Sequence, residues 1–398
     1  MGCAADLPTI WMKNKILIVT GIFPPDIGGP ASYAKTVGQK LSENFRISVV
    51  TYSPVRKSAE DKSLKFKVVR VWRKNFWFFR HLSYFFKVMS LASRNDVVFS
   101  LSTINGGITG LIAARFFKKK FFIRIVGDYA WQTAVLKKKT SLPIDDFQKS
   151  KKSGWIKLLF WLQSFVCRKA DVIIVPSEYI SELVRGWGVP KEKVEVVYNG
   201  SDFKPAELSK EDSRKKIGIA GNIILSYGRL VPWKGFRMLI KIMPKLLEIN
   251  QFFRLVIVGE GPELKTLQTM VKNMGLEKKV YLIGKQSKEQ LAVYLAAADV
   301  FVLNTGYEGF SHEILEAMLA GVPVVTTCVG GNKEIIHQGK NGFMVKYNDE
   351  FNLIEAIKTV CQKPELQKMF TENGKETAKY FSVEKMLEKT VKLLRTQI

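Results

Sequence analysis

The stretch EGFSHEILEAMLAGVPVV, residues 308–325, is the most specific pattern in the chain. It predicts a helix that begins near Ser311, followed by a buried strand. Glu308 precedes this helix and Glu316 lies more than one turn inside it, so the two carboxylates should stand on the order of 8 to 12 Å apart. A single ligand that contains a sugar, a diphosphate and a ribose can touch both.

The start of the same helix favours anion binding. The backbone N–H groups of Phe310, Ser311 and His312 lack partners inside the helix, and the helix dipole adds positive potential there. We expect these groups to point at phosphates placed between Glu308 and Glu316. A surface helix with scattered acids is the alternative, but Glu316 lies among Leu, Ala and Met residues rather than in a polar run.

Two glycine-containing turns precede this stretch, each directly after a predicted strand. The first, SYGRLVPWKG at residues 226–235, contains Arg229 and Lys234, two cations that can neutralise a diphosphate. A solvated pair of surface cations is the alternative. In the second turn, Gly259 and Gly261 let backbone groups cradle a nucleoside.

A third turn follows the first predicted strand, and in it Gly29 and Pro30 lead into a predicted helix. Proline suits the first helical position, and glycine lets an anionic group approach the free N–H groups there. An ordinary strand-to-helix turn explains this pattern equally well.

Short β-branched runs alternate with helix-period segments, which predicts parallel sheets covered by helices on both faces. The expected strands form two series: 16–20, 47–52, 97–101, 121–126, 172–176 and 194–198, then 223–227, 255–258, 280–283, 300–303, 322–326 and 343–345. The fold class is therefore α/β, with two doubly wound, Rossmann-like domains. Ligands bind beyond the carboxyl ends of such strands, so two facing sheets enclose a central cleft.

The length of 398 residues fits two domains. We place the first at residues 1–204 and the second at residues 205–380, with a linker and one short helix near the boundary. Residues 381–398 form a predicted terminal helix. Residues 1–11 precede the first strand and are expected to be dispensable.

The net charge of +26 is unevenly placed. Residues 1–200 have 33 Lys and Arg against 14 Asp and Glu, or +19, and the remainder has 29 against 22, or +7. The first domain should therefore face something anionic, such as nucleic acid, lipid headgroups or a phosphorylated carrier. No apolar run reaches the ~18 residues of a membrane span. The four scattered cysteines favour reduced thiols in a cytoplasm.

Six motifs, in order along the chain, resemble those of the GT-B-fold retaining glycosyltransferases of family 4. They are FPP with GG at 23–29, PSE at 176–178, NGSD at 199–202, GR with KG at 228–235, GEG at 259–261, and 308–316. The resemblance covers nearly the whole chain. It implies a GT-B fold whose final helix crosses back onto the first domain.

The resemblance also implies roles for particular residues. Arg229 and Lys234 would hold the diphosphate of a nucleotide sugar, Glu316 the ribose hydroxyls, and Glu308 the donor sugar near its anomeric carbon, as a catalytic residue. A hexosyl unit would pass with retention to a sugar, lipid-linked or polysaccharide acceptor.

One position departs from the family pattern. After the predicted strand at 121–126, many members carry a histidine that contacts the donor sugar, whereas this chain reads Gly127-Asp128. Asp128 is the nearest polar candidate for a catalytic role as acceptor of a sugar hydroxyl. A structural turn residue is an equally good interpretation.

No Asp-x-Asp element follows a predicted strand, so we expect neither a metal nor a cofactor. Arg229, Lys234 and the helix dipole would stabilise the leaving group. The alternatives are a sugar-nucleotide epimerase of the same fold and a noncatalytic protein that binds membrane or nucleic acid through its basic domain. The intact carboxylates Glu308 and Glu316 favour transfer, and no nucleic-acid-binding signature is present.

Two predicted helices of the first domain combine basic and aromatic residues. In one, Arg73, Arg80, Lys87 and Arg94 recur every seven residues and form a basic stripe beside a cluster of Phe, Trp and Tyr. The other is residues 155–166, with basic ends. Both fit helices packed on the sheet as well as helices at a lipid interface. The charge of +19 favours peripheral docking on an anionic, cytoplasmic membrane face.

Overall fold

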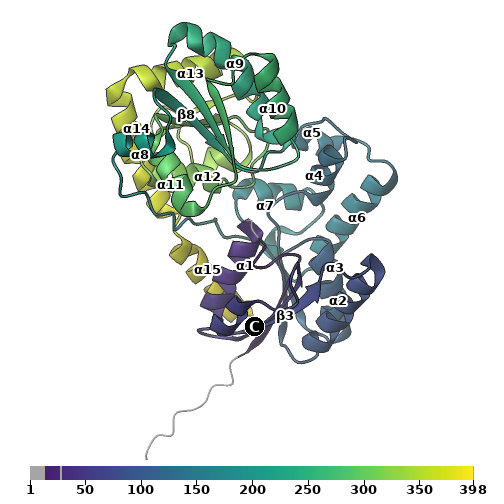
Figure 1. Ribbon diagram of the computed structural model, residues 1–398. Helices are drawn as coiled ribbons and strands as arrows, with labels where there is room; N and C mark the ends of the chain where they lie inside the picture. Colours follow the sequence, from purple (N-terminus) through teal and green to yellow (C-terminus); the bar gives the residue numbers. More distant parts are fainter. Residues whose placement is uncertain (1–13, 27–28, 398) are drawn as a thin grey trace, which may run out of the picture.

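The computed structural model describes residues 14–26 and 29–397. The chain forms two α/β domains, each built on a parallel sheet (Figure 1). In that view the first domain, in purple and blue, lies below the second, in green and yellow. The predicted pair of Rossmann-like domains is confirmed.

The first sheet has seven strands in the order β3-β2-β1-β4-β5-β6-β7. The chain order reverses between β1 and β4, so the switch point where ligands bind lies at the carboxyl ends of these two strands. The strands are β1 (Lys15–Thr20), β2 (Arg46–Ser53), β3 (Lys67–Trp72), β4 (Val97–Ser100), β5 (Lys120–Arg124), β6 (Val172–Val175) and β7 (Val194–Val196).

The edge strand β3 was not predicted. Its sequence KVVRVW has Arg70 in the middle, and a charge there is atypical of a buried strand. Hydrogen bonds compensate for the burial of this charge, because Arg70 donates to both carboxylate oxygens of Asp61 and to the carbonyl of Pro24. The guanidinium is thus satisfied although Arg70 is buried.

The second sheet has six strands in the order β10-β9-β8-β11-β12-β13. All six were predicted, and the switch point falls between β8 and β11. The strands are β8 (Asn222–Tyr227), β9 (Phe253–Val258), β10 (Val280–Gly284), β11 (Val300–Leu303), β12 (Val324–Thr327) and β13 (Phe343–Val345).

Helices cover both faces of each sheet, and buried apolar clusters fill the space on either side. In the first domain these are α1 (Gly29–Leu41), α2 (Trp77–Ala92), α3 (Asn105–Phe116), α4 (Tyr129–Leu136), α5 (Ile144–Lys149), α6 (Gly154–Lys169) and α7 (Glu178–Arg185). In the second they are α8 (Lys210–Ile217), α9 (Phe236–Ile249), α10 (Leu264–Asn273), α11 (Lys288–Ala297), α12 (His312–Leu319), α13 (Glu350–Gln362) and α14 (Pro364–Tyr380).

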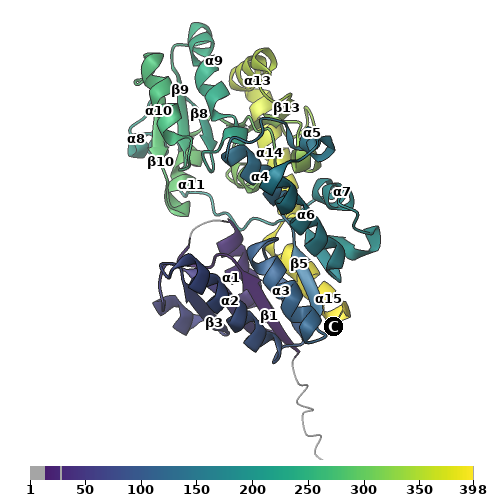
Figure 2. The same ribbon diagram turned by 90° about the vertical axis from the view of Figure 1, so that its right-hand side faces the viewer.

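The last helix, α15 (Val383–Gln397), leaves the second domain and packs on the first. Figure 2 shows it in yellow among the elements of the first domain. Its residues Met386, Leu387 and Leu394 join the core that contains Ile16 and Ile18 of β1.

Within the described residues, no helix combines the length and the apolar character that a bilayer span requires. The basic and aromatic segments of the sequence form α2 and α6, and both are helices of the first domain.

Candidate active site

The cations predicted to hold a diphosphate both follow β8. Arg229 is exposed and forms no ion pair in the part of the chain that the structure describes. Lys234 ends a short 3-10 turn (Pro232–Lys234) and is only 7% exposed. The two residues therefore differ: Arg229 is free to meet a ligand, and Lys234 is already held by the protein.

Two carboxylates hold Lys234. Its Nζ lies 2.8 Å from Glu308 Oε1 and 2.7 Å from Glu313 Oε1. The contact to Glu313 is a hydrogen bond, whereas the contact to Glu308 is an ion pair without hydrogen-bond geometry. An ammonium group has three N–H donors, so at least one is left for another acceptor such as a phosphate oxygen. Glu308 thus lies beside the cation that was predicted to hold the diphosphate.

The three charges shift one another's pKa values. Burial alone would lower the pKa of Lys234, but Glu308 and Glu313 raise it. Burial raises the pKa of Glu308 to about 6, although Lys234 acts in the opposite direction. Against the effect of burial, Lys234 holds the pKa of Glu313 below its usual value. Near neutral pH the cluster is therefore largely ionised, with two negative charges around one positive charge.

Ser311 caps the N-terminus of α12, as expected. Its Oγ accepts a hydrogen bond from the N–H of Ile314 at 3.3 Å and donates to Glu313 Oε2 at 3.1 Å. The backbone N–H groups of Phe310 and Ser311 donate to no acceptor among residues 14–26 and 29–397. Burial lowers the pKa of His312, the first residue of the helix, so its side chain is neutral at pH 7. The helix start thus offers free donors beside Lys234.

Glu316 lies further along α12 and bonds to the end of β8. The hydroxyl of Tyr227 donates to Glu316 Oε2 at 2.9 Å. Burial, together with the charge of Glu313, raises the pKa of Glu316 to about 7. This carboxylate is therefore poised between its protonated and ionised forms at neutral pH.

Gly259 and Gly261 bring the turn after β9 directly against the turn after β8. A Cβ atom on Gly259 would lie 1.9 Å from the carbonyl oxygen of Gly228, and one on Gly261 would lie 2.3 Å from that of Leu230. No larger residue fits at either place. The close approach presents the backbone of both turns at one end of the sheet.

Motifs of the first domain support the loop that carries Glu308. Ser177 Oγ donates to the carbonyl of Gly309 at 2.6 Å, and Asn199 Nδ2 donates to that of Phe310 at 3.5 Å. These contacts explain why the PSE and NGSD motifs accompany the 308–316 motif: they link the two domains at the start of α12.

The structure favours a structural role for Asp128 over a catalytic one. This residue is fully buried and caps α4, where Oδ1 accepts from the N–H of Trp131 at 2.8 Å. Gln163 donates to Oδ1 at 2.9 Å, and Gln148 donates to Oδ2 at 2.8 Å. Of the two interpretations of Asp128, the structure therefore supports the one in which it is a structural turn residue.

A tyrosine occupies the space beside Gly127. A Cβ atom at Gly127 would lie 2.3 Å from the hydroxyl oxygen of Tyr307, which donates to the carbonyl of Val126 at 3.3 Å. The second domain thus fills the position where a side chain at residue 127 would project. Gly29 begins α1 and is exposed, but residue 28 lies outside the described residues, so the anion-binding turn there stays a prediction.

Sequence reasoning missed several residues around the site. Glu313 lies between Glu308 and Glu316 in the sequence and on the same helix as Glu316, but it was not predicted as a site residue. Glu334, which accepts from the N–H groups of Glu178 and Tyr179 at 2.9 and 3.0 Å, links the domains. Arg124 ends β5 as a buried cation that bonds to Asn199 and pairs with no acid in the described chain. None of these had a local sequence signal.

Comparison with known proteins agrees with this geometry. Residues 209–377 match the family described as glycosyl transferases group 1, and residues 27–204 match glycosyltransferase family 4. The two matches fall on the two domains. This chain is a GT-B glycosyltransferase.

Similar proteins support the assignment over different lengths. A Methanocaldococcus jannaschii glycosyltransferase is 24% identical to this glycosyltransferase over 387 residues, which span 92% of this chain and 94% of that one. The N-acetylgalactosamine-N,N'-diacetylbacillosaminyl-diphospho-undecaprenol 4-alpha-N-acetylgalactosaminyltransferase of Campylobacter jejuni is 28% identical. That match spans 59% of this chain and 62% of the relative.

Solved structures show the same fold. The Anabaena protein HepE in complex with UDP-glucose has a TM-score of 0.79 at 20% identity, with 96% of this glycosyltransferase and 99% of HepE covered. Sucrose-phosphate synthase from Thermosynechococcus elongatus gives the same TM-score, identity and coverage. The two family models, which both describe glycosyltransferases, favour transfer over the epimerase and noncatalytic alternatives.

Proposed function

We propose that this chain is a retaining, metal-independent hexosyltransferase that uses a nucleoside diphosphate sugar. The observation that carries the proposal is Lys234, held between Glu308 and Glu313 at the start of α12. Its remaining N–H donor and the free guanidinium of Arg229 are suited to a diphosphate. HepE, which has the same fold, was solved in complex with UDP and with UDP-glucose, and this supports such a donor.

Each residue has a distinct part in the proposed reaction. Negative charge develops on the diphosphate as the bond to the sugar breaks, and Lys234, Arg229 and the N–H groups of Phe310 and Ser311 are preorganised to stabilise it. Glu316 accepts hydrogen bonds from the ribose hydroxyls. Glu308, fixed by Lys234, orients the donor sugar near its anomeric carbon. Because protein groups supply the positive charge, the reaction needs no divalent metal.

We propose a lipid-linked or polysaccharide acceptor of the cell envelope, reached from the cytoplasmic side of the membrane. The Campylobacter relative acts on a diphospho-undecaprenol carrier, and a Rhizobium meliloti relative of 29% identity is named for lipopolysaccharide core biosynthesis. The +19 charge of residues 1–200 suits a phosphorylated carrier or an anionic surface.

A donor panel tests the proposal directly. The purified chain would be incubated with UDP-, GDP- and ADP-sugars without an acceptor, and slow release of the nucleoside diphosphate would be measured. We expect one base to be preferred and Glu308→Gln to lower release while nucleotide binding persists. Absence of both binding and release across the panel would contradict the proposed donor.

A further inference from the structure

Helix α2 has apolar side chains on its outer side as well as on its inner side. Its inner residues Tyr84, Val88 and Ala92 are fully buried against the sheet. The outer residues Phe79 and Phe86 are nevertheless 63% and 60% exposed. A helix that is apolar all round is normally covered on all sides. The core of this domain therefore does not account for the outer aromatic residues.

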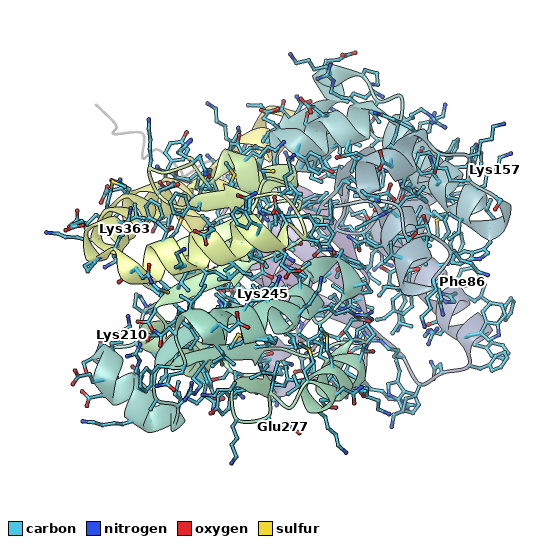
Figure 3. All side chains as sticks on the ribbon, turned by 90° about the horizontal axis from the view of Figure 1, so that it is seen from above. Phe86, Lys157, Lys210, Lys245, Glu277 and Lys363 are labelled. Carbon is cyan, nitrogen blue, oxygen red and sulfur yellow. The ribbon has the colours of Figure 1, made fainter. Side chains whose placement is uncertain are left out.

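Helix α6 repeats the feature on the same side of the domain. Trp155 and Trp161 are exposed although the helix buries Ile156 and Val166. In Figure 1, α2 and α6 flank α3, and α3 packs against both. Figure 3 shows Phe86 of α2 and Lys157 of α6 along the same edge of the molecule.

Helical periodicity extends these two labelled positions to their neighbours. Phe79 lies two turns before Phe86 on α2, and Trp161 lies one turn after Lys157 on α6, so each pair shares a helix face. We call the exposed aromatic side chains of the two helices the aromatic face: Phe79, Phe86 and Trp161 lie on these helix faces, and Trp77, Phe78 and Trp155 lie in the first turn of each helix. Exposed apolar patches of this kind mark interaction sites.

The charge around the aromatic face has one sign. Residues 62–95, 97–127 and 147–170, which contain α2, α3 and α6, include no Asp or Glu. Lys74, Lys151 and Lys157 are exposed and form no ion pair within the described residues. Unopposed cations beside Trp and Phe are typical of proteins that lie at an anionic lipid interface.

The basic stripe predicted from the sequence is not part of this surface. Arg73 donates to both carboxylate oxygens of Asp26 at 2.9 and 2.7 Å. Arg80 donates to the carbonyl of Arg73 and Lys87 to that of Arg70, each at 2.9 Å. Only Arg80 and Lys87 of the four predicted stripe residues lie on α2, so the stripe does not form on one helix face. Arg73, Arg80 and Lys87 contact their own domain instead.

We propose that the aromatic face, with Lys74, Lys151 and Lys157, docks on the surface of an anionic lipid bilayer. The inference rests on the proposed function only for the location of the acceptor. Helix α2 follows β3, and α6 runs back toward the start of β6, so both helices begin at the carboxyl edge of the sheet. Ligands bind along that edge, so a docked molecule has its cleft near the lipid headgroups.

Vesicle co-sedimentation of the full chain tests the docking. One set of vesicles contains phosphatidylcholine alone, and the other contains phosphatidylcholine and phosphatidylglycerol in equal parts. Replacement of Lys74, Lys151 and Lys157 by Glu should lower partitioning onto the anionic vesicles by on the order of 100-fold. The matched control replaces Lys272, Lys278 and Lys363 of the second domain by Glu, and it should bind nearly as well as the parent.

A second variant tests the aromatic contribution. Trp77→Ser, Phe78→Ser and Phe79→Ser together should reduce binding to anionic vesicles, whereas Phe252→Ser with Phe351→Ser in the second domain should not. In the parent, tryptophan emission should move to shorter wavelength when anionic vesicles are added. The proposal would be overturned if the Trp77, Phe78 and Phe79 variant and the Phe252 and Phe351 control lost vesicle binding equally, or if the parent did not bind.

Two further measurements separate the alternatives. If light scattering shows that the parent is a dimer and the aromatic variant is a monomer, the aromatic face binds a second copy of this chain and the lipid proposal fails. Acceptor-free hydrolysis of the nucleotide sugar is measured without vesicles, so its absence counts against the proposed function alone. The lysine variant should retain that hydrolysis, because its substitutions are exposed residues of the first domain and none belongs to the proposed donor site.

Discussion

The two domains carry their positive charge in opposite ways. In the second domain the functional cation Lys234 is buried between Glu308 and Glu313, and the net charge of residues 201–398 is only +7. In the first domain, at +19, Lys74 and Lys157 are exposed and form no ion pair with the residues that the structure describes. Paired and buried charge fixes one geometry, as a small ligand requires, whereas unpaired and exposed charge attracts an extended anionic surface.

The largest effect is expected from removing the paired cation. Lys234→Met leaves two buried carboxylates face to face, which should cost about 3 kcal/mol of stability, and nucleoside diphosphate affinity should fall at least about tenfold. Thermal unfolding and calorimetry measure the two losses. Lys241→Met, which breaks the exposed pair with Glu350, should change neither. Unchanged nucleotide affinity in Lys234→Met would show that the buried, paired cation of the second domain does not bind the nucleotide.

Arg229 separates ligand binding from stability within the same domain. Arg229→Ala removes a charge-assisted contact worth roughly 1.5 to 3 kcal/mol to the diphosphate. Because Arg229 is exposed and unpaired in the described chain, the melting temperature should stay within experimental error. Arg185→Ala, an exposed arginine of the first domain, is the control. A fall in melting temperature with intact affinity would give Arg229 a structural role instead.

A smaller effect comes from pH. The raised pKa of Glu316, about 7 against a usual 4.5, means that its contribution to stability is present below pH 4.5 and is lost as pH rises through about 7. Ribose hydroxyls donate to the ionised carboxylate, so nucleotide binding should strengthen from about pH 6 to about pH 8 and release a proton at the lower pH.

Calorimetry in two buffers with different ionisation enthalpies measures this proton. The same titration of Glu316→Gln subtracts the proton that the ligand itself exchanges. An identical proton count in the parent and the variant would remove Glu316 from the nucleotide site.

Chelation should have the smallest effect. If protein cations alone meet the diphosphate charge, turnover in excess EDTA should equal turnover without it. Loss of activity in EDTA, restored by Mg²⁺ or Mn²⁺, would show that Lys234 and Arg229 do not suffice.

Sequence reasoning was most successful where a property is local. Twelve strands were predicted from runs of β-branched residues. The start of α12 was predicted at Ser311, which lies within one short motif. It failed where the partner is distant in sequence. The strand β3 needs Asp61 and Pro24 to accommodate Arg70, and the role of Asp128 depends on Gln148 and Gln163.

The error on α2 has the same origin. A seven-residue repeat of Arg and Lys suggests a shared helix face, but Arg73 and Arg94 lie outside α2, and the repeat does not show which side of the segment meets the domain. Asp26, on the loop after β1, decides that by pairing with Arg73. Glu313 was overlooked for a related reason, because its importance comes from Lys234, which lies in another turn.

Helix α15 constrains how the protein is made. The first domain begins with β1, which ends at Thr20, but its core also contains Leu394. During synthesis this domain leaves the ribosome first. One face of its sheet then keeps an uncovered apolar surface until the second domain and α15 have been translated. Completion of the first domain therefore follows synthesis of the second, and until then nascent chains are exposed to aggregation or chaperone binding on the α15 side.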